Sequence, residues 1–411
     1  QGVNIRTIQR YMGHKSLETT MRYLHLTRKG QEDAYNIINS YMSGFSYDMG
    51  EIMTVYGPSY LETYSEHIPR QHYKVIRDII YCRTHAMGTV LCGCSECGST
   101  YEIPCSCGNR HCPTCQGDKA HMWLEKRLDS MLPVNHFMIT FTVPSEFRDV
   151  FRKNQRILYS ALFEATSKTM TQLASEDTYL KGDLPGFFGV LHTWGRTMQY
   201  HPHIHYIVPG GAFDSSDHSW HNANPAFFLP IKVMSKLVKQ KMFQVMRREN
   251  LLSSVPASAW KTSWNVNSKP VGSGERSIRY LGAYIFRTAI SDRRILRVSN
   301  EMVSFQYVDT KSGKNKTMRV SIFEFIRRFL QHVLPSGFMK IRYYGYMHPS
   351  SRIPLQLAVA LLEAFSPQSR PRKTTTKQSG PTSFVSYCVH CKGIITYLRF
   401  IPPIHSCAGF T

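Results

Sequence analysis

The chain has 411 residues, enough for two or three domains and at least one sizeable hydrophobic core. Its 50 lysines and arginines outweigh its 28 aspartates and glutamates, which gives a net charge of +22. The 42% apolar composition argues against general disorder. The sequence as given shows no membrane-length apolar run, and no apolar stretch of the secretory type opens it, so we expect neither a membrane span nor export. These features disfavour integral membrane and exported proteins. They favour nucleic acid over a membrane surface or an acidic protein as the partner.

Apolar spacing predicts the following elements from the N-terminus: short helices in 1–45, a helix over 66–80, a cysteine-rich block over 82–115, a helix over 117–131, a strand over 136–143 and helices within 146–174. Further elements follow in chain order: strands over 186–194 and 203–208, helices over 232–250 and 275–290, a hairpin of 302–308 with 317–320, helices over 321–333 and 355–365, and a basic linker over 366–383. Strands and long helices alternate without a regular βαβ pattern. The sequence therefore predicts an α+β fold.

The cysteine-rich block holds ten candidate metal ligands within 34 residues: Cys82, His85, Cys92, Cys94, Cys97, Cys105, Cys107, His111, Cys112 and Cys115. Cys94 with Cys97, and Cys112 with Cys115, have the CxxC spacing that lets two thiolates reach one tetrahedral zinc. A structural zinc stabilises a segment too short to form its own core. The block therefore predicts one or two zinc ions and leaves the pairing of ligands open. Ten ligands are enough to close two zinc sites, whereas a single zinc would leave the other cysteines buried without a metal.

A second, smaller cluster lies near the C-terminus. Cys388 and Cys391 form another CxxC pair, and His405 and Cys407 follow them. This spacing predicts a further zinc knuckle.

Three histidines stand in the five residues that begin a predicted strand. His203 and His205 share one face of that strand, and His201 lies near them. Two imidazoles on one side of a strand form half of an open divalent-metal site, where a cation can polarise a phosphoryl oxygen. Ordinary surface histidines and a metal-dependent hydrolase are the alternatives.

Two tyrosines, Tyr280 and Tyr284, have the i, i+4 spacing that places both phenols on one face of a predicted helix. Candidate DNA-binding arginines surround them: Arg276, Arg279, Arg287, Arg293 and Arg294. Guanidinium groups bind phosphate oxygens, and with a metal-bound phosphate they would help a phenol ionise and attack. A helix that packs two tyrosines into a core is the alternative.

Several motifs in this order resemble one family: NRHCPTCQ (109–116), HFMITFTVP (136–144), LHTWGRTMQYHPHIHYIVPGG (191–211), YLGAY (280–284) and RYYGY (342–346). The chain resembles, over roughly residues 65–365, the bacterial rolling-circle transposases of insertion-sequence family ninety-one. These are two-tyrosine members of the HUH endonuclease superfamily.

The resemblance implies a central antiparallel sheet of the HUH type, with His203 and His205 as the HUH motif and Tyr280 and Tyr284 as nucleophiles. It implies cleavage and rejoining of single-stranded DNA through a 5′-phosphotyrosine, with Mg²⁺ or Mn²⁺ and no small-molecule cofactor. It also implies a cytoplasmic bacterial protein that reaches the nucleoid through DNA.

The sequence departs from the family pattern in two places. Arg196 stands where a glutamine usually follows HTWG, and the histidine that is usual near Val90 is absent, with Cys92 as the candidate substitute. The third ligand of the catalytic metal is therefore open between His192 and Gln199.

The first 27 residues resemble something else, the C-terminal end of a tyrosine recombinase of the phage-integrase type. His14 and Tyr23 in IRTIQRYMGHKSLETTMRYLHLT match its late histidine and its nucleophile. The upstream arginines and lysine of that active site are missing, so we expect this segment to be inert.

We therefore expect five regions: a helical recombinase remnant (1–45), a zinc-binding, DNA-binding module (66–131), a catalytic domain (132–365), a basic linker (366–383) and a C-terminal knuckle (384–411). The predicted function is a transposase for single-stranded DNA. Two alternatives stay open, namely a non-enzymatic zinc-dependent DNA-binding protein and a rolling-circle nickase or replication initiator.

Overall fold

The computed structural model describes residues 48–115, 123, 132, 134–217, 219–272, 288–351, 357–360, 362 and 386–403. The recombinase-like segment, the linker and most of the helices expected over 117–131 and 275–290 lie outside these residues. Residues 288–290 are described and are not helical.

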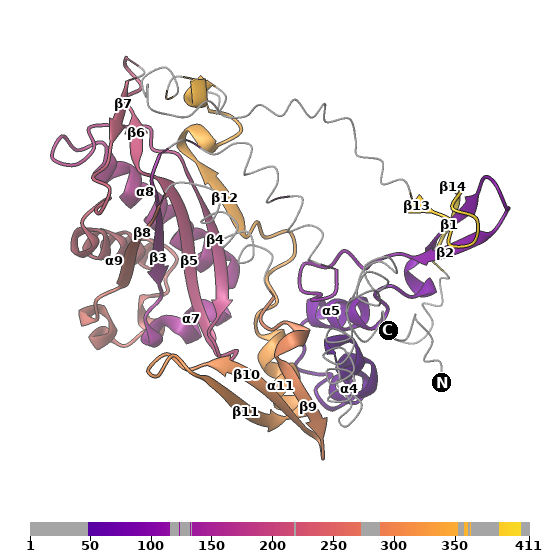
Figure 1. Cartoon of the computed structure of the whole chain (residues 1–411). Coiled ribbons are helices and arrows are strands. Elements are labelled where there is room, and N and C mark those ends of the chain that lie inside the picture. Colours follow the sequence, from indigo (N-terminus) through magenta and orange to yellow (C-terminus); the bar gives the residue numbers. More distant parts are fainter. Residues whose placement is uncertain are drawn as a thin grey trace.

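A five-stranded antiparallel sheet forms the centre of the molecule (Figure 1). Its spatial order is β12 (Ile341–Tyr344), β4 (Phe187–Trp194), β5 (Tyr200–Pro209), β3 (His136–Thr142) and β8 (Asn265–Gly272). The predicted strands in 136–143, 186–194 and 203–208 become the three middle strands. This sheet with its helices confirms the α+β prediction.

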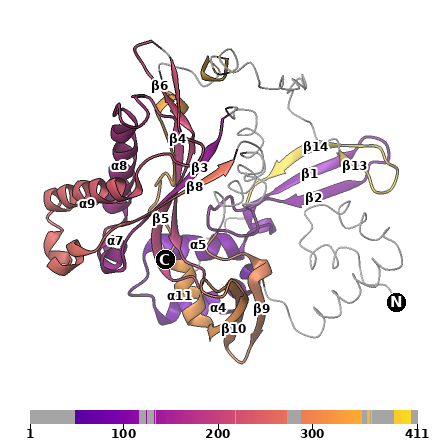
Figure 2. The same cartoon turned by 60° about the vertical axis from the view of Figure 1, so that its left-hand side comes forward.

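Helices cover one face of this sheet. They are α7 (Arg148–Lys153), α8 (Gln155–Ala174) and α9 (Ile231–Arg248), and Figure 2 shows α8 and α9 together on the side away from β1, β2 and β14. Ile204 and Tyr206 of β5 are fully buried in the core beneath these helices, and the Tyr206 hydroxyl lies 2.7 Å from Thr166 Oγ1 of α8. Because residues alternate along a strand, His203 and His205 belong to the opposite face.

A second core joins two helices that precede the central strands in the chain with a helix and a small sheet that follow them. It contains α4 (Met49–Thr63), α5 (Arg70–Ile80), α11 (Ile322–Leu330) and a three-stranded sheet of β9 (Ile295–Ser299), β10 (Met302–Val308) and β11 (Asn315–Ser321). The β10–β11 pair confirms the predicted hairpin. Helix α4 was not predicted, because Gly50, Gly57 and Pro58 interrupt its helical pattern. A capping box between Asp48 and Glu51 starts it.

The C-terminal described segment pairs with the cysteine-rich block in a third sheet. Its order is β13 (Ser386–Tyr387), β14 (Ile394–Ile401), β1 (Thr89–Cys94) and β2 (Thr100–Pro104), and it projects beyond α5 in Figure 1. Strands β1 and β14 pair antiparallel, with Thr89 opposite Ile401. The expected C-terminal unit therefore contributes strands to the sheet of the cysteine-rich block.

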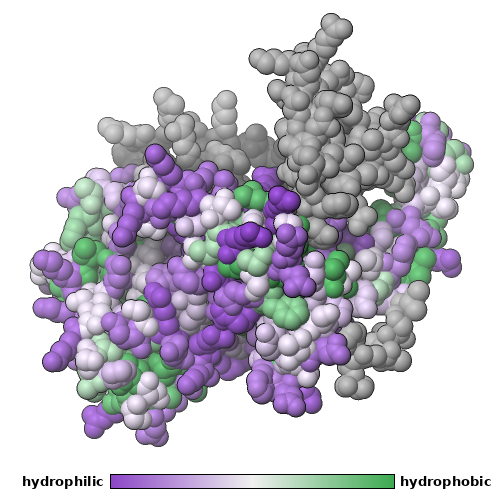
Figure 3. Space-filling model, turned by 90° about the horizontal axis from the view of Figure 1, so that it is seen from below, coloured by the Kyte–Doolittle hydropathy of each residue, from purple (hydrophilic) through white to green (hydrophobic). Residues whose placement is uncertain are grey.

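Shorter elements complete the described fold: strands β6 (Gly211–Phe213) and β7 (Trp220–Asn222), and 3₁₀ turns at His85–Met87, Ser145–Phe147, Leu252–Ser254, Ala257–Lys261, Asp292–Arg294 and Gly345–Met347. Hydrophilic side chains cover most of the face seen from below (Figure 3). Within the described residues, no helix has the length and apolar character needed to cross a membrane.

Candidate metal centres and nucleic-acid site

Four cysteines of the block converge beside α5. The first cysteine group consists of Cys82, Cys107, Cys112 and Cys115, whose Sγ atoms all lie within 4.8 Å of one another. The sulphurs of Cys107 and Cys115 are 3.7 Å apart, and a tetrahedral zinc with Zn–S bonds of ~2.3 Å separates its ligands by ~3.8 Å. The four thiols therefore have the number and spacing of a closed structural zinc site.

The second cysteine group joins the cysteine-rich block to the C-terminal described segment. It consists of Cys94, Cys97, Cys388 and Cys391, again with all Sγ atoms within 4.8 Å. Cys94 Sγ lies 3.4 Å from Cys391 Sγ, and Cys97 Sγ lies 3.5 Å from Cys388 Sγ. The hydrogen bond of Cys388 with the Tyr101 hydroxyl lowers the pKa of this thiol, which favours the thiolate that binds zinc.

The two cysteine groups indicate how the candidate zinc ligands pair, which the sequence left open. They differ from the expected separate C-terminal knuckle. We expected Cys388 and Cys391 to form a separate knuckle with His405 and Cys407. Instead this pair completes a group with Cys94 and Cys97, because β14 pairs with β1. His405 and Cys407 lie outside the described residues.

Three other expected zinc ligands, Cys92, Cys105 and His111, join neither group within the described chain. The His111 ring has a hydrogen-bond partner of its own. Its Nε2 accepts a hydrogen bond of 3.3 Å from the backbone N–H of Leu334. His85, the tenth candidate, hydrogen-bonds Thr89 Oγ1 through Nδ1 at 3.0 Å and is likewise outside both groups.

The histidine group lies on the face of the central sheet that α8 and α9 leave uncovered. It consists of His192, His203 and His205, each with a ring nitrogen within 4.8 Å of the others. His192 of β4 is directly opposite His203 of β5 in the strand register. Strand pairing therefore supplies the third histidine, and His192 rather than Gln199 joins the pair. The Gln199 amide oxygen instead accepts from the Thr197 backbone N–H at 3.0 Å.

Hydrogen bonds orient the rings of this group. His203 Nδ1 donates to the carbonyl of His201 at 2.7 Å, so the neutral ring keeps an unprotonated Nε2 that can bind a metal. His205 Nδ1 lies 2.9 Å from Thr140 Oγ1. Burial lowers the pKa of His203 to about 3 and that of His205 to about 4. Both imidazoles are therefore neutral at pH 7, the form that binds metals.

His201 was expected among the ligands, but the structure gives it another partner. An Arg148 guanidinium nitrogen lies 2.8 Å from His201 Nδ1. Arginine can only donate, so Nδ1 accepts and the proton of the neutral ring is on Nε2. Neither nitrogen then offers a lone pair, and His201 does not belong to the histidine group.

The expected nucleophiles and most of the expected DNA-binding arginines, namely Tyr280, Tyr284, Arg276, Arg279 and Arg287, lie outside the described residues. Arg293 is exposed. Arg294 has a structural role, since it donates to the carbonyls of Gln306 at 2.8 Å and Arg196 at 2.6 Å. Arg196, which departs from the family pattern, donates to the carbonyl of Val308 at 3.0 Å. These bonds tie the turn after β4 to β10.

Comparisons with known proteins agree with these sites. A family model described as "Putative transposase" matches residues 186–353, which hold the histidine group, and one described as "Transposase zinc-binding domain" matches residues 52–143, which hold the first cysteine group. No solved structure matches the chain significantly.

Two relatives cover most of the chain. "Putative transposase y4qJ" of Sinorhizobium fredii is 35% identical over 320 residues, which is 73% of this chain and 80% of that protein. "Transposase for insertion sequence element IS801" of Pseudomonas savastanoi pv. phaseolicola is 25% identical over 290 residues, covering 67% of this chain and 70% of that protein. The chain therefore belongs to the zinc-binding transposases of the IS91 and IS801 type.

Proposed function

We propose that this transposase cuts and rejoins single-stranded DNA through a 5′-phosphotyrosine intermediate, as in rolling-circle transposition. The observation that carries the proposal is the histidine group, three imidazoles on the face of the central sheet opposite α8 and α9, of which those of His203 and His205 are neutral at pH 7. Three ligands leave coordination positions open for substrate, which is the arrangement of a catalytic rather than a structural metal site.

The donor set bears on which cation fits. The histidine group has three imidazoles and, among the described residues, no carboxylate. Imidazole suits Mn²⁺ better than Mg²⁺, which prefers oxygen ligands. A divalent cation bound there would polarise a phosphoryl oxygen of the DNA. The structure thus favours Mn²⁺ within the pair of cations that the family resemblance implies.

In the proposed reaction a tyrosine phenol gives up its proton, and its oxygen attacks the scissile phosphorus and forms an O–P bond. The bond to the 3′ oxygen breaks, and this oxygen takes up a proton to become a free 3′-hydroxyl. One phosphodiester replaces another, so rejoining needs no ATP. Two nucleophiles, Tyr280 and Tyr284, would allow two successive strand transfers, one at each end of the element.

A covalent-adduct assay tests the proposal. The full chain is incubated with Mn²⁺ and single-stranded oligonucleotides from the element's ends, and adducts are resolved on denaturing gels. We expect adducts that disappear with EDTA and in the Tyr280→Phe, Tyr284→Phe double variant. Adducts in that variant would refute the assignment of the nucleophiles. Salt-dependent DNA binding without any adduct would favour the non-enzymatic alternative.

A further inference from the structure

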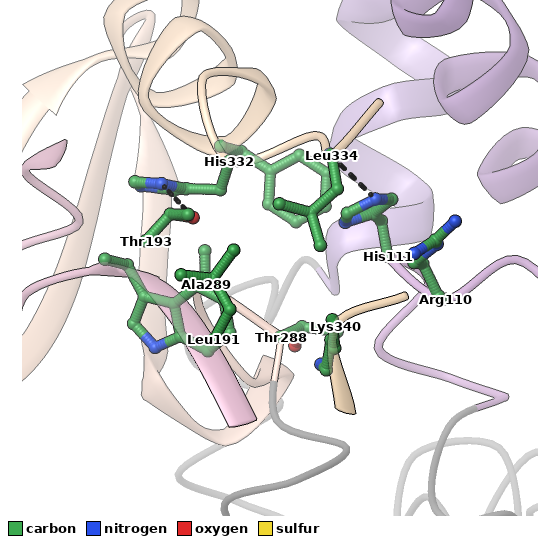
Figure 4. Close-up of a pocket in the computed structure, with 11 residues that line it drawn as sticks. Arg110, His111, Leu191, Thr193, Thr288, Ala289, His332, Leu334 and Lys340 are labelled. Atoms are coloured by element: carbon green, nitrogen blue, oxygen red, sulfur yellow. Dashed lines mark hydrogen bonds between the residues drawn. The ribbon is translucent and has the colours of Figure 1, made fainter. Parts of the chain in front are cut away.

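A small pocket lies between the first cysteine group and the end of β4 (Figure 4). Arg110 and His111 approach from the segment that leads into Cys112. Lys340, which precedes β12, and Trp194, which ends β4, approach from the central sheet. The zinc-binding and catalytic parts of the chain therefore both contribute to its wall.

The pocket is cationic. Lys340 and Arg110 line it, and no aspartate or glutamate occurs among its described lining residues. The Lys340 ammonium makes no hydrogen bond or ion pair with a described residue and lies 5.8 Å from the centre of the Trp194 ring. Burial, with a smaller contribution from the charge of Arg110, lowers the pKa of Lys340 to about 8. Lys340 is half-buried, and a half-buried cation without a counter-ion among the described residues favours the binding of an anion.

The neighbouring polar groups of the pocket are already hydrogen-bonded. His332 donates from Nε2 to the carbonyl of Met198 at 3.0 Å and accepts at Nδ1 from Thr193 Oγ1 at 3.2 Å. Arg110 donates to the carbonyl of Phe338. These bonds fix the wall in place. Lys340 is then the lining cation that has no described anionic or hydrogen-bonding partner.

The pocket is also close to the histidine group. The Trp194 ring lies 4.8 Å from the His192 ring and 5.8 Å from Lys340 Nζ, so at most 10.6 Å, the sum of these distances, separates the ammonium from the His192 ring. In B-DNA the phosphates of one strand follow one another about every 3.4 Å along the helix axis. A strand therefore crosses this interval within a few nucleotides.

We propose that this pocket binds a backbone phosphate of the single-stranded DNA, a few nucleotides from the one that reacts. Lys340 is the principal contact and Arg110 the second. Because the pocket is small, the phosphate oxygens enter it and the sugar and base stay outside. The inference rests on the proposed function for its choice of single-stranded DNA, and it gives the strand a fixed position between the zinc-binding and catalytic parts.

Salt-dependent DNA binding tests this subsite. Affinity of the full chain for a fluorescent, mixed-sequence single-stranded oligonucleotide is measured by anisotropy in EDTA, at several salt concentrations. Loss of one phosphate contact makes the plot of log K against log salt shallower by about 0.7 for a single strand. We expect this change in Lys340→Gln, with affinity about five-fold weaker near 0.1 M salt. EDTA must leave zinc in the cysteine groups during the measurement. Each sample is therefore assayed for zinc afterwards, and only samples that keep their zinc are compared.

Two variants serve as controls. Lys340→Arg keeps the charge and should keep the slope. Lys236→Gln removes an exposed lysine on α9, on the opposite side of the sheet, and should leave the slope unchanged. An unchanged slope in Lys340→Gln, an equal loss in Lys340→Arg, or an equal loss in Lys236→Gln would each overturn the inference. The adduct assay fails or succeeds independently, because binding in EDTA requires no cleavage.

Discussion

The cysteine groups and the histidine group differ in how many ligands they offer. Each cysteine group has four thiols, which close a tetrahedral zinc and leave no position for substrate. The histidine group has three imidazoles and leaves positions open. The second cysteine group also links segments 291 to 297 residues apart, whereas the histidine group lies on β4 and β5, two strands that follow one another in the chain. Ligand number therefore separates sites that stabilise the fold from a site suited to chemistry.

The largest effect on stability should follow loss of the first cysteine group. Cys112 is fully buried in the core that contains α4, α5 and α11. Cys112→Ser should release one of two zinc ions per chain and destabilise the protein by several kcal/mol, on the order of a structural zinc's contribution. Metal analysis and thermal unfolding measure both effects. Cys105→Ser, outside both groups, should keep two zinc ions, and a zinc loss there would contradict the pairing.

The histidine group should show the reverse pattern, lost chemistry with a retained fold. His203→Ala should lower the rate of adduct formation by about 100-fold or more, because a lost ligand removes metal assistance worth several kcal/mol. Thermal unfolding and zinc content should stay close to wild type. Full adduct formation in this variant would show that the open site is not the catalytic one.

Loss of the second cysteine group should be milder than loss of the first. Cys97 and Cys391 are exposed, and the group anchors only the projecting sheet. Cys391→Ser should release one zinc and expose the backbone of β14 to hydrogen exchange, with global stability reduced by roughly 1 kcal/mol. A loss as large as that of Cys112→Ser would mean that the two groups are equivalent supports.

The smaller of the two effects on catalysis should come from His201, which touches the histidine group without joining it. His201→Ala removes the partner of Arg148 but keeps the backbone carbonyl that orients His203. We expect an adduct rate about 10-fold lower, the scale of a lost supporting contact, with an unchanged Mn²⁺ requirement. An effect equal to that of His203→Ala would restore His201 to the ligand set.

Much of the fold followed from local pattern. Alternating apolar residues marked β3, β4 and β5, and helical spacing marked α8, α9 and α11, within a few residues of their observed ends. Helix α4 and strands β9 and β12 escaped prediction because their patterns are short or broken by glycine and proline. They form because neighbouring elements bury one of their faces.

The sequence by itself determined the family, the CxxC pairs and the His203–His205 strand, because these depend on residues close together in the chain. Only the tertiary structure decided that Cys94 and Cys97 meet Cys388 and Cys391, 291 to 297 residues away. The tertiary structure also places His192 beside His203 as the third histidine, and it pairs His201 with Arg148 through a hydrogen bond. These outcomes depend on which strands pair and in what register, a property of the whole chain that no local spacing encodes.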